Sequence, residues 1–211
     1  GTLQYCLAAH SGPLRDDALI RLDDLMGFNW PRFFGWVEEH KWIKFILALF
    51  YNSLLFQVLG VLFIAPPAFS CRAARFTTAF IISTLLTMFF FWLLPASGPF
   101  VSFHHTDLQQ ASYTEHFMQV RAHTLAVVQI NDIRGIISFP SFHVSSAVII
   151  TYFFHRLPVA FFLAIILLNV GVSIAALVIG GHYLCDVLGG IAIGVATIFI
   201  VRALDGGKPE E

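Results

Sequence analysis

The sequence predicts an all-α fold, a bundle of about five to six transmembrane helices with one further helix lying in the membrane interface. Hydrophobic residues make up 57% of the chain and charged residues only 12%, whereas a soluble domain is about a quarter charged. Five apolar runs are separated by proline, glycine or charged residues, as in a multi-pass membrane protein. No repeat or linker divides residues 1–211, so a single membrane domain is predicted.

The N-terminal segment, residues 1–41, is expected to lie at the membrane interface. Residues 2–10 resemble the end of an apolar segment, which predicts a further helix or a processed segment upstream. Residues 14–40 alternate acids and bases with leucines and are followed by aromatic side chains, a mixture that suits an interfacial helix. A solvated connector is the alternative for the same residues.

The transmembrane core, residues 42–203, should contain five spans: 42–64, 76–94, 139–154, 159–179 and 182–203. Prolines close the first two spans, and residues 71–75 form a short basic loop between them. Residues 96–138 are the longest polar stretch, and a loop of this length in a compact domain is usually functional or disordered.

The distribution of basic residues predicts the orientation of the bundle. One side of the membrane receives Arg72, Arg75, Arg156, Arg202 and Lys208, and the loop 96–138 falls on the other. The positive-inside tendency makes the first side cytoplasmic, although five basic residues between positions 15 and 44 oppose it. We therefore expect a multi-pass protein of the plasma or inner membrane whose long loop faces the periplasm, the exterior or a lumen.

Composition also excludes some classes of partner and site. A net charge of −1 argues against nucleic acid, whose binding requires a basic surface. The three cysteines are scattered without a CxxC pair, so neither a disulfide framework nor a thiolate metal site is predicted.

Two motifs carry most of the information about function. The first is Phe-Pro-Ser-Phe-His, which ends at His143, and the second runs from Gly180 to Asp186 with the sequence Gly-Gly-His-Tyr-Leu-Cys-Asp. His182 follows His143 by 39 positions, the length of about two membrane crossings. This spacing predicts that both histidines lie at the same membrane face, on the side of the long loop.

The second motif has the spacing of an oriented histidine. His182 and Asp186 are four residues apart, so on a helix they would share one face. The carboxylate would bond one imidazole nitrogen and leave the other as the lone pair that a nucleophile needs. Gly180 and Gly181 would leave the N–H groups of the helix N-terminus open to an anion.

The first motif places His143 in the first turn of a span, with Pro140 at an early helical position. His143 would face the anion from the other side and protonate a leaving oxygen. Ser141 would either cap the helix or bond a phosphate oxygen. A single polar residue in a span is often a bond to a neighbouring helix, but three ionisable groups converging at one depth favour a reaction site. No specific role is predicted for His104, His105, His116 or His123.

Together, the two motifs resemble the second and third signature motifs of the type-2 phosphatidic acid phosphatase and vanadium haloperoxidase superfamily. The branch they resemble contains inositol phosphorylceramide synthase, an inositolphosphotransferase, and many bacterial lipid phosphatases. The resemblance runs from about residue 42 to 203 and includes the stretch from Arg72 to Pro99. It implies a phosphohistidine mechanism in which His182 attacks phosphorus, Asp186 orients it and His143 protonates the departing alcohol. It also implies that no metal or other cofactor is required.

The chain departs from that superfamily in its basic residues. Residues 91–100 contain none where the first motif has Lys and Arg, and Ala176 and Phe142 replace a usual Arg and Gly. Arg134, nine positions before His143, is the leading candidate to balance the phosphate charge, with Arg121 second. A surface charge facing lipid headgroups is the alternative for Arg134. The predicted phosphate-binding residues are Ser141, Arg134, Phe142 and Gly181.

These expectations describe an enzyme that cleaves or transfers a phosphoryl or phosphoalcohol group of a phospholipid, sphingolipid or polyprenyl phosphate, with water or an alcohol as acceptor. A proton-coupled transporter with a His–Asp relay is the main alternative, and it would place ionisable groups near mid-membrane. A zinc hydrolase that adds a loop histidine lacks an HExxH motif. A haloperoxidase fits the superfamily but not burial in a membrane.

Overall fold

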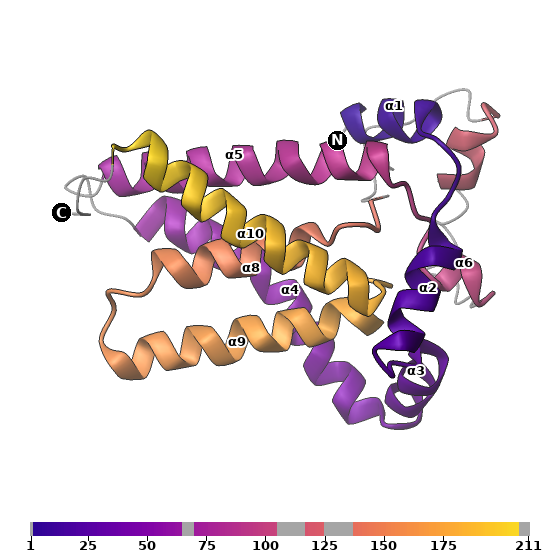
Figure 1. The fold of residues 1–211 in the computed structure, drawn as a ribbon. Helices are drawn as coiled ribbons and strands as arrows, with labels where there is room; N and C mark the ends of the chain where they lie inside the picture. Colours follow the sequence, from indigo (N-terminus) through magenta and orange to yellow (C-terminus); the bar gives the residue numbers. More distant parts are fainter. Residues whose placement is uncertain (1, 65–69, 105–116, 125–136, 207–211) are drawn as a thin grey trace.

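The computed structural model describes residues 2–64, 70–104, 117–124 and 137–206, and its elements there are helices (Figure 1). Their order along the chain is α1 (Thr2–His10), α2 (Asp16–Leu25), α3 (Trp30–Glu39), α4 (Lys41–Ile64), α5 (Ser70–Leu93), α6 (Pro99–Ser102), α8 (Phe142–Phe153), α9 (Val159–Val178) and α10 (Leu184–Leu204).

The predicted all-helical membrane bundle is confirmed. Within the described residues, four helices are long and apolar enough to cross a membrane, and their apolar windows are Lys41–Val61, Arg72–Leu93, Val159–Val178 and Leu184–Leu204. The remaining predicted span, 139–154, corresponds to the shorter apolar helix α8. In Figure 1 these helices run alongside one another, and α1, α2, α3 and α6 gather at one end of the bundle.

The predicted basic loop at residues 71–75 is wrong, because α5 already begins at Ser70. The two arginines in the first two turns of α5 contact neighbouring helix ends. Arg72 donates a hydrogen bond to the Phe153 carbonyl at the end of α8, and Arg75 pairs with Asp205 after α10 at 3.0 Å. A hydrogen bond and an ion pair therefore connect helix ends here, at the end of the bundle opposite α1, α2 and α3 (Figure 1).

The single interfacial helix predicted over residues 14–40 is two helices, α2 and α3. They are separated by a turn in which Gly27 adopts a φ of 75°, a conformation that favours glycine. Asn29 then caps α3, its side chain accepting the Arg32 N–H at 2.9 Å. Residues 2–10 form a helix of their own, α1, in which Tyr5 and Ala8 pack in a cluster around Phe91.

Helices α8 and α10 approach closely because glycines of α10 face α8. A Cβ atom at Gly190 would lie 2.4 Å from the Ser141 carbonyl oxygen, and one at Gly194 would lie 2.7 Å from the Val148 Cβ. Small residues four apart are a common means of close helix contact in membranes. This contact sets the separation between the starts of α8 and α10, which lie within the two predicted motifs.

Replacing Gly190 with alanine should therefore force α8 and α10 apart. Overpacking of this kind costs about 1–3 kcal/mol, so we expect a lower unfolding temperature in detergent. Gly35→Ala is the matched control, because a Cβ at Gly35 in α3 meets nothing within 4 Å. Equal unfolding temperatures for the two variants would contradict the close contact.

Candidate active site

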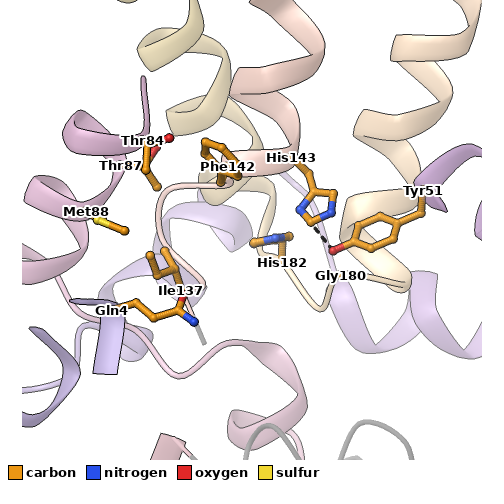
Figure 2. A pocket seen from close by; sticks show the side chains of 10 residues that line it. All are labelled: Gln4, Tyr51, Thr84, Thr87, Met88, Ile137, Phe142, His143, Gly180 and His182. Atoms are coloured by element: carbon orange, nitrogen blue, oxygen red, sulfur yellow. Dashed lines mark hydrogen bonds between the residues drawn. The ribbon is translucent and has the colours of Figure 1, made fainter. Parts of the chain in front are cut away.

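A cavity of about 220 Å³ is lined by a residue of α1 and by the first residues of α8. It brings together residues from α1, α4, α5, α8 and the segments before α8 and α10 (Figure 2): Gln4, Tyr51, Thr84, Thr87, Met88, Ile137, Phe142, His143, Gly180 and His182. The structure thus places His143 and His182, which are far apart in the sequence, on the wall of one cavity.

The spacing of His182 and Asp186 predicted that both lie on one helix face. His182 is instead outside the helix, because α10 begins two residues later at Leu184. Asp186 is the third residue of the helix and reaches back over its start. Its Oδ2 accepts the Tyr183 N–H at 2.9 Å and lies 3.3 Å from the His182 Nδ1. The pair is made by the geometry of an N-terminal helix cap, and both residues are buried.

A third group contacts the same carboxylate oxygen. The Ser138 hydroxyl donates to the Asp186 Oδ2 at 2.9 Å, so three groups contact this one oxygen. Among the described residues, no group bonds the other oxygen, Oδ1. Nothing in the spacing of the motifs had indicated Ser138.

The N-terminus of α10 is not open to an anion, contrary to the sequence-based expectation. The Leu184 and Cys185 N–H groups donate to the two oxygens of Asp23 at 2.8 and 2.9 Å. This helix end therefore already binds an anionic group that belongs to the chain. A phosphate placed on the same N–H groups would meet the like charge of Asp23.

His143 is the second residue of α8 and is held by Tyr51 from α4. The two rings stack with their centroids 4.2 Å apart and 16° between their planes. The Tyr51 hydroxyl lies 3.3 Å from the His143 Nδ1, the contact drawn as a dashed line in Figure 2. A lone tyrosine in an apolar span was the available signal for this residue, and sequence reasoning passed over it.

Of the described residues predicted to bind phosphate, one lines the cavity and two lie next to lining residues. Phe142 lines the cavity. Ser141 occupies the N-cap of α8, but its side chain makes no cap bond; its N–H donates to the Asp186 carbonyl at 3.0 Å. Pro140 precedes this cap and is not an early helical residue. Gly181 adopts a φ of 62° beside the lining residue Gly180.

The structure describes only one of the two arginines that were predicted to balance the phosphate charge. Arg134, the leading candidate, lies outside the described residues. Arg121 donates to the Ser11 hydroxyl at 2.6 Å and the Gly12 carbonyl at 2.8 Å, so it fastens the segment after α1. The described residues that line the cavity include no Lys or Arg.

The histidines of the long loop give no metal cluster in the part of the chain that is described. His104 and His123 are exposed, and His105 and His116 lie outside the described residues. The described ranges contain no group of three His, Cys, Asp or Glu side chains arranged to hold a metal ion.

Comparison with known proteins gives the family. The family model of the PAP2 superfamily matches residues 17–200, which is most of the chain. No curated protein and no solved structure matches it. Members of this superfamily are generally metal-independent phosphatases, so the match implies a phosphate-ester substrate. With four helices among the described residues long enough to span a bilayer, the chain is a membrane protein that belongs to the PAP2 superfamily.

Proposed function

We propose that this protein cleaves or transfers the phosphoryl group of a membrane lipid through a phosphohistidine formed on His182. The observation that carries the proposal is that His143 and His182 line one cavity while a buried carboxylate contacts the Nδ1 of His182. With Nδ1 engaged by Asp186, the Nε2 of a neutral imidazole carries the lone pair that attacks.

In the first step, the His182 Nε2 forms a bond to phosphorus and the bond from phosphorus to the lipid oxygen breaks. His143 donates a proton to the departing alcohol oxygen. The Tyr51 hydroxyl near the His143 Nδ1 leaves Nε2 as the nitrogen that exchanges this proton. Asp186 compensates the positive charge that develops on the His182 ring.

In the second step, an oxygen nucleophile attacks the phosphohistidine and the phosphorus–nitrogen bond breaks. His143, now neutral, takes the proton of that nucleophile. Water as the nucleophile gives hydrolysis, and an alcohol gives transfer. The inositolphosphotransferase branch that the motifs resemble would use an alcohol.

The proposed orientation places the cavity at the extracytoplasmic face. The opposite end of the bundle carries the arginine contacts of Arg72 and Arg75, which the positive-inside tendency assigns to the cytoplasm. A lipid substrate would reach the cavity from the outer leaflet. Labelling of an introduced surface cysteine beside α2 with an impermeant reagent tests this orientation in intact cells.

The test of function is phosphate release from purified protein in detergent, with phosphatidic acid, a sphingolipid phosphate and a polyprenyl phosphate as substrates. EDTA should leave the rate unchanged, and orthovanadate should inhibit it. Added inositol or a lipid alcohol distinguishes transfer from hydrolysis by the product formed. Loss of the rate in EDTA would instead favour the zinc hydrolase, and proton-coupled uptake without phosphate release would favour the transporter.

Tyr51→Phe should lower kcat by about 3- to 10-fold, the effect of one neutral hydrogen bond, and leave KM within about 2-fold. The ring that stacks on His143 remains, so the fold should persist. Tyr152→Phe is the matched control, because Tyr152 also stacks on a histidine, His155, near the far end of α8. Equal kcat values for the two variants would remove the Tyr51 hydroxyl from the mechanism.

A further inference from the structure

Helix α2 turns two of its acidic side chains, Asp16 and Asp23, toward the protein. Its buried residues are Asp16, Leu19 and Asp23, which recur on one helix face, and the two carboxylates are only 7% and 3% exposed. Leu25 on the outer side is 84% exposed. Leu19 packs in a cluster with Ala96 and Tyr183, and the two buried carboxylates add polar contacts to this docking.

Asp16 binds the turn that precedes α6. Its carboxylate accepts the Ser97 N–H at 3.0 Å and the Gly98 N–H at 2.9 Å. It also accepts the Tyr183 hydroxyl at 3.0 Å. Burial and the neighbouring Asp16 carboxylate raise the pKa of Tyr183 far above its ordinary value, so the hydroxyl remains a donor.

Asp23, two turns along the same face, binds the start of α10. It accepts the N–H groups of Leu184 and Cys185, one on each oxygen. Hydrogen bonds of this charge-assisted kind are about twice as strong as neutral ones, and two N–H groups on one carboxylate also fix its direction. The segment held in this way begins two residues after His182.

The segments that Asp16 and Asp23 bind lie next to the His182–Asp186 pair. Gly98, held by Asp16, packs so closely that a Cβ atom there would lie 3.0 Å from the Gly181 carbonyl and 3.1 Å from the Ser138 hydroxyl. Ser138 in turn bonds Asp186. The two carboxylates of α2 thus fix the backbone before and after His182.

We propose that Asp16 and Asp23 are positioning residues, and that α2 is a brace that sets the geometry of the His182–Asp186 pair from outside the cavity. The proposal rests on the proposed function of that pair. Neither carboxylate lines the cavity, so each acts through the backbone it holds. A brace of this kind should affect turnover much more than substrate binding.

Helix α2 supplies its own matched controls, because Asp17 and Asp24 are the exposed neighbours of the two buried carboxylates. Asp16→Asn and Asp23→Asn place an NH₂ group against a backbone N–H, whereas Asp17→Asn and Asp24→Asn change only an exposed side chain. We expect kcat to fall by about 10- to 100-fold for the first two, within the range lost when catalytic groups are misplaced. KM should stay within about 3-fold, and the controls should keep both constants.

A second readout follows the His182 ring itself. In protein with ¹⁵N-labelled histidine, the Nδ1 resonance of His182, assigned by its loss in His182→Ala, should move in Asp16→Asn and Asp23→Asn and stay in place in the controls. If both Asn variants fail to fold, Tyr183→Phe removes one donor to Asp16 and should still shift the resonance and lower kcat.

The outcomes separate the two proposals. Full activity of His182→Ala overturns the phosphohistidine mechanism. An inactive His182→Ala together with Asn variants whose kcat equals that of their controls overturns the brace. An unmoved His182 resonance in every folded variant, Tyr183→Phe included, overturns the brace whatever the activity of His182→Ala.

Discussion

Replacing His182 with alanine should reduce phosphate release from a lipid phosphate by at least about 10³-fold, because removal of a nucleophile abolishes the covalent route. The loss should appear in kcat with every substrate, since the same nitrogen attacks phosphorus whatever alcohol departs. His155→Ala is the control, because His155 is an exposed histidine just beyond α8, at the end of the bundle opposite the cavity.

The covalent intermediate gives this prediction a direct measurement. Substrate labelled in its phosphoryl group should transfer label to the protein, and alkaline quenching preserves a phosphohistidine that acid releases. The label should map to the peptide containing His182 and be missing from His182→Ala. Label on any other peptide, or full turnover by His182→Ala, would contradict the proposed mechanism.

The membrane bundle was predictable because hydropathy measures the free energy of placing a long segment in hydrocarbon. The helix ends were less predictable. Arg72 and Arg75 indicated a loop by charge, yet their side chains satisfy a carbonyl and a carboxylate at neighbouring helix ends, so the backbone stays helical from Ser70. Hydropathy carries no information about such partners.

Sequence reasoning proposed residues for the candidate site, but it did not predict their geometry. The spacing of His182 and Asp186 suggested a shared helix face, but a carboxylate three residues into a helix also bonds the N–H before it, and that local bond places Asp186. The role of Asp23 depends on a contact across more than 160 residues of sequence. Such a contact leaves no local pattern, and so the N-terminus of α10 looked free.

The cation beside the phosphate stays a prediction. Arg121 is engaged by the segment after α1, which leaves Arg134 as the basic residue proposed from the sequence. Arg134→Ala should raise KM or lower kcat if the guanidinium contacts the phosphate, and unchanged constants would assign it to the membrane surface.

The proposed proton donor, His143, is best tested by the leaving group. His143→Ala should lower turnover of a lipid phosphate by about 10²- to 10⁴-fold, the usual contribution of a general acid. An alkoxide is a poor leaving group and needs the proton as the bond to phosphorus breaks. A nitrophenolate is stable without it, so the same variant should lose less than about 10-fold with p-nitrophenyl phosphate.

The comparison with His182→Ala makes the leaving-group test specific. The nucleophile is required for both substrates, so His182→Ala should be inactive on each, whereas His143→Ala should recover on the activated one. A general disturbance of the cavity would lower both rates alike. Equal losses on the two substrates would therefore assign His143 to binding or to structure, and Tyr51 would then position a binding residue and not an acid. A large difference between the substrates is the result that the shared cavity and the separate contacts of the two histidines lead us to expect.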